Sequence, residues 1–413
     1  MTINLDADWD AICMPRRGVA ALTRMAFAGE DLHPLWNELM EKASDDAAGS
    51  GMGMDLSIIA QLMGDKKTGL AIQKDTLALH RLYRSPCGAA PALRVLALAA
   101  AMDIGGNTPL EFLLADSRIA LATCYLVPGL PLPDPLPDHD VAIVVMPDGD
   151  AAGPALASLA ALAPRWPRPL LNAPARIGLL DRDRLYHCLS GIAGLEIPQT
   201  ARLDRESLAA LAADPASLKR HLTDGDFPLI VRPIGSHAGF GLAKLADGAA
   251  LSAYLEARPE AEFFLSRFVD YASRDGLYRK YRIVAVDGKA YACHMAIAED
   301  WKVWYLNADM ALSVSHRMEE AMFMRDFDAG FAARHGAALA GMIARLGLDY
   351  VIIDCAETPA GALLVFEADN TAIVHNMDPV NVYPYKPSQM QTIFKAVQTM
   401  LYRKAGRLSA QTV

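Results

Sequence analysis

In the first 88 residues, apolar side chains recur at spacings of three and four, as in helices with one buried face. The clearest sets lie at positions 22–26, 35–40, 58–63 and 77–83. Because a period near 3.6 places such residues on one side of a helix, residues 1–88 are predicted to form a helical N-terminal region. No fixed repeat period occurs in it, so a structural or partner-docking role is expected rather than a repeat array.

Residues 89–170 change to short apolar runs that alternate with helical segments. The runs lie at 93–99, 120–127 and 141–145, with helical segments at 109–115 and 154–162. Strands that are apolar throughout and alternate with helices are typical of a small doubly wound α/β domain with a parallel sheet. The carboxyl ends of such strands line a ligand crevice, which here would be formed by the turns at 103–107 and 147–150.

Residues 171–405 combine helices and strands in a less regular order. Helices are expected at 183–192, at 328–346 and from about Ser388, with Pro387 at the start of the last one. Strands are expected at 227–233, 262–270, 279–286, 290–297, 350–353 and 362–366. The predicted fold class is therefore multidomain, α/β in the second region and α+β in the third.

Composition narrows the class of protein. The chain has 413 residues, of which 53% are hydrophobic and 21% charged, which suits two or three globular domains. A net charge of −9 leaves no basic surplus for a general nucleic-acid binder. No apolar run reaches the ~18–20 residues that cross a bilayer, and the start is acidic rather than basic and then apolar, so a cytoplasmic protein without membrane contact is expected. Six cysteines without a CxxC pair indicate reduced thiols.

A strand followed by a small-residue loop is the first candidate for chemistry. The strand at 227–233 carries Arg232 and ends in proline, and the loop after it contains Gly235, Ser236, His237, Gly239 and Gly241. Glycines let backbone N–H groups approach an anion, and a guanidinium suits phosphate oxygens. The loop is not a Walker motif. An ordinary hairpin is the alternative.

Two later strands end in oxygen-rich residues. The strand at 350–353 ends in Asp354, and the strand at 362–366 is followed by Glu367, Asp369 and Asn370. The turn at 358–361 predicts that the strands pair as a hairpin and bring Asp354 close to Glu367. Hard oxygen ligands of this kind suit magnesium that is also held by nucleotide phosphates, whereas a solvated strand end is the alternative.

Between these two pieces lie a strand at 262–270 and a basic strand at 279–286. The first is apolar enough to form a hinge beside an adenine ring. The second carries Lys280 and Arg282, which could meet nucleotide phosphates or an anionic substrate, or form a solvated edge. His294 lies on the strand after the Asp287-Gly288 turn.

The order of these pieces resembles the ATP-grasp superfamily, in particular ribosomal-protein glutamate ligases and glutathione synthetases. The shared elements are a strand ending in a cation and proline, a small-residue loop, a hinge strand, a basic strand and a closing Asp and Glu-x-Asn pair. The closing stretch reads Gly347-Leu348-Asp349-Tyr350-Val351-Ile352-Ile353-Asp354, followed by Glu367. The resemblance covers about residues 171–385. Residues 90–170 are similar to the α/β domain that usually precedes this fold, and the first 87 residues are not covered.

Two positions depart from the family's pattern. Arg232 stands where lysine is common, which keeps the charge and changes its geometry. The second residue after Glu367 is Asp369 instead of asparagine, and Asn370 follows it. Since residues two apart share a face of a strand, Asp369 is the expected ligand, with Asn370 as the alternative if a bulge shifts the register.

The resemblance implies a two-lobed ATP-grasp fold, with a first lobe at 171–265 that includes a mobile loop, a metal-binding lobe at 266–405 and a tail at 406–413. It implies Mg²⁺, or Mn²⁺, on Asp354, Glu367 and Asp369 or Asn370. The entry-helix contact maps to Arg182 or Arg184, and Arg184 is taken as the nucleotide contact. The other implied ATP-binding residues are Arg232, Gly235, Ser236, His237, Gly239, Gly241, Arg267, Phe268, Val269, Asp270 and Lys280. Arg282 and His294 are the catalytic candidates, with a structural core histidine as the alternative for His294.

The resemblance also implies the reaction. A carboxylate would attack the γ-phosphate of ATP, and an amine would capture the acyl phosphate to give an amide or peptide bond, ADP and phosphate. A phosphotransferase that stops after phosphoryl transfer is one alternative, and a nucleotide-binding scaffold without turnover is another. The expected partners are small-molecule or peptide carboxylates and amines, with homo-oligomerisation or docking through the N-terminal helices left open.

Overall fold

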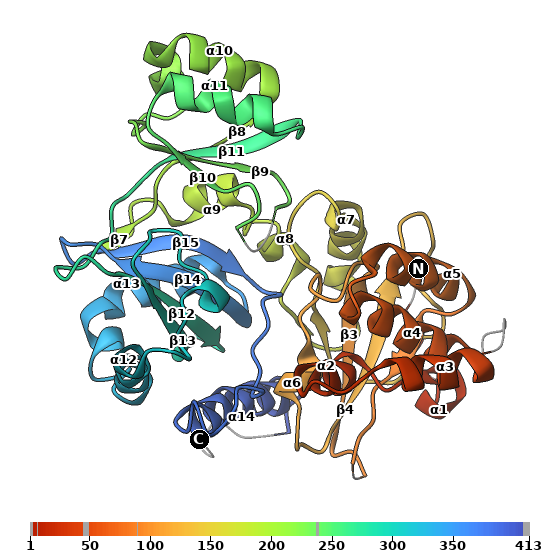
Figure 1. Cartoon of the computed structure of the whole chain (residues 1–413). Helices are drawn as coiled ribbons and strands as arrows, with labels where there is room; N and C mark the ends of the chain where they lie inside the picture. The colour runs from red at the N-terminus through yellow and green to blue at the C-terminus, as the bar shows by residue number, and fades with distance from the viewer. Residues whose placement is uncertain (1–2, 6, 44–48, 89, 237–238, 408–413) are drawn as a thin grey trace.

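The computed structural model describes residues 3–5, 7–43, 49–88, 90–236 and 239–407. Three sheets organise this part of the chain (Figure 1). A six-stranded sheet belongs to the first half, and a four-stranded and a five-stranded sheet belong to the second half. The expected mixed α/β class is confirmed.

The first sheet has the order β1-β2-β4-β3-β5-β6. Its strands are β1 (Met14–Pro15), β2 (Leu82–Arg84), β3 (Leu93–Ala100), β4 (Ile119–Leu126), β5 (Val141–Val144) and β6 (Leu170–Leu171). Strands β4, β3, β5 and β6 pair in parallel. This pairing is the one that the apolar runs predict, because a parallel sheet is covered on both faces. Helices α6 (Leu110–Leu113) and α7 (Gly153–Leu162) follow β3 and β5.

The described part of the N-terminal region is mainly helical. Its helices are α1 (Trp9–Ile12), α2 (Val19–Phe27), α3 (His33–Lys42), α4 (Ser50–Leu62) and α5 (Lys66–Leu79). They lie beside β3 and β4 in Figure 1, and Met54 and Leu77 share a buried core with that sheet. Because β1 and β2 also belong to the sheet, the sheet crosses the boundary expected at residue 88, and the helices are one of its covering layers.

The four-stranded sheet forms a lobe with a core of its own. Its order is β10-β9-β11-β8, from β8 (Thr200–Asp204), β9 (Leu229–Pro233), β10 (Ala243–Leu245) and β11 (Glu262–Arg267), all antiparallel. Helices α10 (Arg205–Ala213) and α11 (Gly248–Ala257) bury Leu208 and Leu251 against Leu229 and Val231. This lobe is the green unit at the top of Figure 1.

The five-stranded sheet has the order β13-β12-β14-β15-β7. Its strands are β7 (Leu195–Glu196), β12 (Tyr278–Val286), β13 (Lys289–Ala298), β14 (Tyr350–Glu357) and β15 (Leu363–Asp369). Helices α12 (Val314–Arg325), α13 (Phe331–Leu346) and α14 (Lys386–Lys404) accompany it. The predicted hairpin of β14 and β15 is present, and so is the turn at Asp287 and Gly288, both of which have positive φ.

Helices α10, α11 and α12 were not predicted from the apolar spacing. A different signal marks them: Asp204, Asp247 and Ser313 each precede a helix and accept a hydrogen bond from the backbone N–H three residues later. Such N-caps satisfy amides that the first helical turn leaves unpaired. Capping residues would therefore have located helices that the apolar spacing did not reveal.

The carboxyl end of the first sheet meets the end of β15. The side-chain amide of Asn370 donates to the carbonyl of Met146 at 2.7 Å, and Thr108 Oγ1 donates to the carbonyl of Asn370 at 2.6 Å. On α14, Gln398 donates to the carbonyl of Leu113 at 3.1 Å. These bonds hold the crevice of the α/β domain against the hairpin with the predicted metal ligands.

Candidate active site

Four polar side chains form one row across the five-stranded sheet. His294 of β13 is directly opposite Arg282 of β12. Arg282 is opposite Asp354 of β14, which in turn is opposite Glu367 of β15. Side chains that are directly opposite on adjacent strands share a face, and adjacent strands lie about 4.8 Å apart. The row therefore spans about 14 Å and unites both predicted catalytic residues with two predicted metal ligands.

The centre of the row is a buried ion pair. Arg282 binds Asp354 through Nε at 2.8 Å and Nη2 at 2.9 Å, and Lys280 Nζ lies 2.8 Å from Oδ2 of the same carboxylate. Burial disfavours its charged form, but Arg282 and Lys280 hold the pKa of Asp354 well below its usual range. Since both oxygens are occupied, Asp354 orients the two cations in this structure.

Glu367, at one end of the row, is paired with Arg182. Arg182 is the first residue of α9 (Arg182–Leu189), and it donates to Glu367 Oε2 and, at 2.9 Å, to the carbonyl of Phe366. Burial opposes ionisation, yet Arg182 and Lys280 lower the pKa of Glu367. The hairpin thus carries carboxylates that stay charged because cations surround them.

Arg184, the expected entry-helix contact, lies elsewhere. Its guanidinium donates to the carbonyl of Gly178 at 3.2 Å and lines an open hollow with Arg345. Two residues along an α-helix are rotated by about 200°, so Arg182 and Arg184 lie on opposite faces of α9. The structure therefore brings Arg182, and not Arg184, to the row; an entry-helix contact with the nucleotide stays a prediction.

Asp369 and Asn370 occupy different surroundings at the end of β15. Asp369 remains on the face of Glu367, because the irregularity in the β14–β15 pairing lies before Glu367 and the register from Glu367 to Asp369 is continuous. Asp369 accepts from the backbone and hydroxyl of Thr371 at 2.6 and 2.8 Å, and burial raises the pKa of Asp369. Asn370 is fully buried, and its Oδ1 has no hydrogen-bond partner among the described residues.

Arg232 is a half-buried cation without a carboxylate partner in the part of the chain that the structure describes. It lies on β9 and donates to the hydroxyl of Ser236 at 3.2 Å and to the backbone carbonyl of the same residue. Burial lowers the pKa of Arg232 to about 9, the neighbouring charge of Arg182 adds to the effect, and Glu367 compensates only in part. An unpaired charge in such a place is costly, so an anion brought by a ligand would stabilise it.

The loop after β9 has the backbone that its glycines predict. Positive φ angles occur at Gly235 (69°), Gly239 (73°) and Gly241 (66°). These angles suit glycine, and a Cβ on Gly241 would lie 2.5 Å from Pro233 Cδ. Lys302, which was not predicted as a site residue, crosses from the other lobe and donates to the carbonyl of Leu242 at 3.3 Å. His237, predicted as a nucleotide contact, lies outside the described residues.

In the predicted hinge, Arg267 is engaged by protein carboxylates. Its Nε lies 3.0 Å from Asp224 and its Nη2 lies 2.7 Å from Glu196 on β7. Because β11 and β7 belong to different sheets, this guanidinium ties the two lobes together. Its expected contact with ATP stays a prediction, and its observed role is structural.

The next hinge residues form an aromatic and cationic surface. Lys244 Nζ lies 4.2 Å from the centre of the Phe268 ring, and Trp301 meets that ring edge-on at 5.7 Å. Val269 is half-buried against the main core, and exposed Asp270 accepts from the backbone of Ala272 at 3.0 Å. An aromatic face beside a lysine suits a planar base with attached phosphates.

At the other end of the row, His294 borders a buried cluster. Its ring meets Tyr305 edge-on at 4.6 Å, and its Nδ1 is a buried nitrogen without a described hydrogen-bond partner. Burial, together with the charges of Arg282 and Lys386, holds the pKa of His294 well below its usual value. His294 is therefore neutral, with a free ring nitrogen on the face of the row.

Lys386 and Glu320 form the interior of that cluster. Their side chains are 3% and 0% exposed, and Lys386 Nζ lies 3.5 Å from Glu320 and 3.1 Å from Asp378. Tyr385 donates to Glu320 at 2.5 Å, and Lys386 also donates to the hydroxyl of Tyr305. The aromatic segments that the sequence places around residues 301–305 and 383–386 thus meet beside His294.

The turn after β5 adds a carboxyl that was expected only as part of a strand-end crevice. Burial raises the pKa of Asp148 to about 7, with further contributions from the charges of Asp369 and Asp181. Arg182 acts in the opposite direction. Asp148 therefore faces the acidic end of β15 from the first domain.

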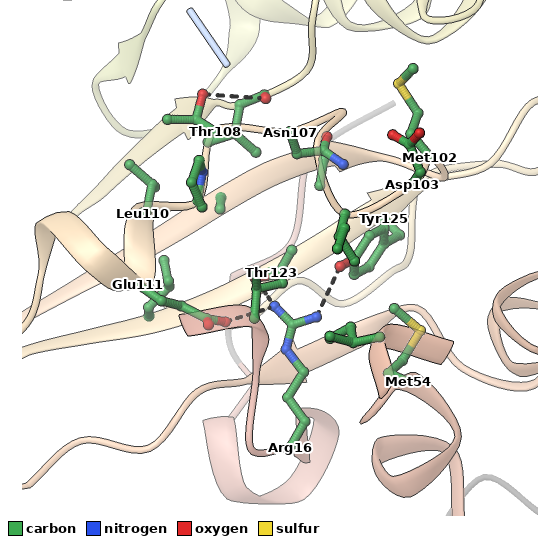
Figure 2. A pocket seen from close by; sticks show the side chains of 18 of the residues that line it. Arg16, Met54, Met102, Asp103, Asn107, Thr108, Leu110, Glu111, Thr123 and Tyr125 are labelled. Carbon is green, nitrogen blue, oxygen red and sulfur yellow. Dashed lines mark hydrogen bonds and ion pairs between the residues drawn. The ribbon is translucent and has the colours of Figure 1, made fainter. Parts of the chain in front are cut away.

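The other strand end, after β3, borders an interior cavity of about 50 Å³ (Figure 2). Arg16 projects into it and donates to Tyr125 at 2.9 Å and to Thr123 and Glu111 at 3.2 Å. Burial disfavours the charge, but Tyr125 and Glu111 raise the pKa of Arg16. Since its charge is matched by Glu111, Arg16 joins the N-terminal region to the sheet and has a structural role.

The residues at the end of β15 fit a hard cation. Glu367 Oε1, Asp369 Oδ2 and the buried Oδ1 of Asn370 are oxygen atoms without a described hydrogen-bond partner. Among the described residues, no three His, Cys, Asp or Glu side chains form a ready metal cluster. Magnesium suits this arrangement, because it commonly takes one or two carboxylates and completes its shell with water and nucleotide phosphates.

Comparison with known proteins gives similarity of structure only. No family model and no curated protein matches the chain. It is similar to a RimK-domain ATP-grasp protein from Sphaerobacter thermophilus (20% identity, TM-score 0.43, 75% of this chain and 99% of that chain). It is also similar to D-alanine–D-alanine ligase from Bacillus anthracis complexed with ATP (14%, 0.45, 76% and 98%) and to the ATP-grasp ligase PsnB complexed with its precursor peptide (11%, 0.39, 76% and 100%). The first and the third of these proteins are ATP-grasp proteins, the superfamily that the sequence motifs resemble. Within the described ranges, no helix is long and apolar enough to span a bilayer.

Proposed function

We propose that the chain is an ATP-dependent carboxylate–amine ligase. The observation that carries the proposal is that two groups of charges differ in balance. In the row from His294 to Glu367, the charge of Arg282 is balanced by Asp354, whereas the guanidinium of Arg232 has no carboxylate partner among the described residues. The charges of Arg182 and Glu367 both act on the pKa of Arg232, which supports placing Arg232 and the row on either side of one space. A nucleotide polyphosphate supplies the negative charge that this space lacks.

In this proposal the phosphates of ATP lie between Arg232, the glycine loop and the row. Lys280 and Arg282 lie beside the γ-phosphate, held in place by Asp354. Lys244, Phe268 and Trp301 form the surface for the base. Fixed cations of this kind stabilise charge that moves onto the transferring phosphoryl group without reorganising during the reaction.

Glu367, Asp369 and Asn370 would hold magnesium. Asp354, which was also expected as a ligand, could bind the metal only after Lys280 and Arg282 moved away from its oxygens. When bound, the metal neutralises charge on the β- and γ-phosphates. The protein's own part is to keep Glu367 ionised through Arg182 and Lys280 and to hold Asn370 at the seam with the first domain.

The chemistry has two steps. An oxygen of the substrate carboxylate attacks the γ-phosphorus, the bond to the β-bridging oxygen breaks, and ADP leaves with the electron pair. The amine nitrogen then attacks the acyl carbon, the C–N bond forms, and the C–O bond to phosphate breaks. The proton of the amine passes to a base, and the neutral ring of His294 at the end of the row is the candidate acceptor.

The decisive test is trapping with hydroxylamine, in which purified protein is incubated with ATP, magnesium and pools of carboxylic acids. A ligase yields a hydroxamate from its acid together with ADP. ADP without hydroxamate supports a phosphotransferase, and nucleotide binding without turnover on any pool would leave a scaffold protein. Arg232→Met serves as the control, because it removes the phosphate contact and leaves the row unchanged.

A further inference from the structure

A solvent-open hollow of about 440 Å³ lies on the side of α9 away from Arg182. It is formed by α8 (Pro174–Ile177), α9 and the last turn of α13. The side chains that line it are Arg176, Leu179, Arg184, His187, Cys188 and Arg345. None of them is acidic, although the chain has 48 Asp and Glu against 39 Lys and Arg.

Each of the three arginines uses only one nitrogen, Nη1, to bind the protein. These Nη1 atoms donate to backbone carbonyls: Arg184 to Gly178 (3.2 Å), Arg176 to Arg345 (3.5 Å), and Arg345 to Cys188 (3.2 Å) and Ser190 (2.6 Å). Nε and Nη2 of all three have no hydrogen bond or ion pair to any residue in the described ranges. The Nε–Nη2 edge is one that can take two oxygens of a phosphate or carboxylate side by side.

A purely structural explanation accounts for one of the three. Arg345 binds carbonyls at the end of α9, where a cation is favourable. Arg176 and Arg184 are exposed and each make a single carbonyl contact. The charges of Asp181 and Asp150 act on Arg184, but neither carboxylate lines the hollow. Three arginines that line one hollow, with their Nε–Nη2 edges unused among the described residues, suit an anionic ligand.

We propose that this hollow binds a small phosphate-bearing anion with at least two negative charges. The site is separate from the proposed nucleotide site, because Arg182 and Arg184 lie on opposite faces of α9. A bound anion would join α8, α9 and α13. Since α9 begins with Arg182, which holds Glu367, and α13 leads into β14 with Asp354, occupancy of the hollow bears on both carboxylates of the row.

The test is calorimetric titration of the full chain with pyrophosphate at low salt, without nucleotide. The wild type is compared with the double variant Arg176→Ser/Arg184→Ser, which leaves the carbonyl bonds of Arg345 in place. The matched control is Arg165→Ser/Arg220→Ser, because both residues are exposed, lie outside the hollow, and remove the same charge. We expect affinity to fall at least tenfold in the first double variant and less than twofold in the control.

A third variant separates this site from the ligase site. Arg232→Met is expected to lose ATP binding and to keep pyrophosphate binding in the hollow. Equal pyrophosphate affinity in the wild type and in Arg176→Ser/Arg184→Ser would overturn the proposal, as would loss of binding in Arg232→Met alone. A parallel titration with citrate tests the chemical class, and tighter binding of citrate than of pyrophosphate would replace phosphate by a polycarboxylate. None of these outcomes depends on turnover, so failure of the proposed ligase activity is a distinct result.

Discussion

Two arginines in this molecule, Arg16, which is buried, and Arg232, which is half-buried, have opposite surroundings. Arg16 lies between the N-terminal region and the first sheet, where Glu111, Tyr125 and Thr123 bind its guanidinium. Arg232 is on β9 of the four-stranded lobe, where among the described residues it donates only to Ser236, and where the charge of Arg182 outweighs that of Glu367. These surroundings raise the pKa of Arg16 but lower the pKa of Arg232 to about 9.

This difference in charge balance suggests two roles: a cation balanced by a protein carboxylate stabilises the fold, and a cation without such a partner is suited to bind an anionic ligand. A matched buried charge is stable without any partner from outside, whereas an unmatched one has a cost that only a ligand removes. Arg282 is matched by Asp354, and Glu367, at the end of the same row, lies near enough to Arg232 to act on its pKa. Whether a protein carboxylate balances an arginine therefore distinguishes roles that the residue type alone does not.

The largest expected effect is on stability, in Arg16→Met. The substitution keeps the approximate volume of the side chain but leaves Glu111 buried without its cation, so the free energy of unfolding should fall by about 3–5 kcal/mol. Urea denaturation followed by circular dichroism measures it. Adding Glu111→Gln should restore most of the loss, because the neutral amide can accept from the Ala20 N–H through its oxygen and donate to the Ser85 hydroxyl through its nitrogen. A double variant as unstable as the single one would show that Arg16 acts through packing, not charge.

Arg232→Met should show the reverse pattern. We expect kcat/KM for ADP formation to fall by about 10²–10³-fold, since a fixed cation at a transferring phosphoryl group contributes on this scale. Stability should be unchanged or increased, because an uncompensated buried charge is removed. Steady-state kinetics and thermal melting are measured on the same preparation. Arg232→Lys should retain more activity than Arg232→Met, and a melting temperature that falls as in Arg16→Met would contradict the comparison.

Much of the fold could be predicted because its signals are local. The apolar runs of β3, β4 and β5 and the hairpin of β14 and β15 follow from strand length and turn residues. The joining of β1 and β2 to the first sheet could not be predicted, because two- and three-residue strands have no measurable periodicity. Their place in the sheet depends on contacts with β4, which is distant in sequence.

The site was predictable in its residue types but not in its pairings. The sequence indicated Arg282, Asp354 and Glu367, yet it left Arg182 and Arg184 open because both lie in the same helical segment. Only the docking of α9 on β15 decides which of them contacts Glu367. Lys386 and Glu320 were missed for the same reason, since a buried ion pair between α14 and α12 leaves no local pattern.

Asp148 gives the next prediction, which concerns pH. Its folded pKa of about 7 lies above the value of about 3.8 in an unfolded chain, so between pH 4 and 7 the folded state holds a proton that the unfolded state has lost. The free energy of unfolding should therefore fall as pH rises through this window. Asp148→Asn stays neutral and should be more stable than the wild type by about 4 kcal/mol at pH 8, since each pKa unit is worth about 1.4 kcal/mol, with no difference at pH 4.

Urea denaturation of both proteins from pH 4 to 8 measures this difference. The contributions of the other titrating groups to the free energy of unfolding are the same in both proteins and cancel in the comparison. Magnesium with ATP should reduce the advantage of the variant, because positive charge near Asp369 favours ionised Asp148. A difference that is constant across the range would show that Asp148 is ionised throughout.

The smallest expected effect, a change in kcat/KM, comes from Arg182 and Arg184 on α9. These two arginines test whether the charge partner of an arginine decides its role. Arg182→Ser should lower kcat/KM by about tenfold, since Glu367 would lose a charge-assisted hydrogen bond worth about 1.5 kcal/mol. Arg184→Ser should change it less than twofold, because that guanidinium contacts only a backbone carbonyl on the opposite face. The two variants remove the same group from positions two residues apart on one helix. A difference between them in steady-state kinetics would therefore reflect the partner of each arginine and not its charge. Equal losses would mean that both arginines act on the site through the general field of α9, and that charge matching does not assign their roles.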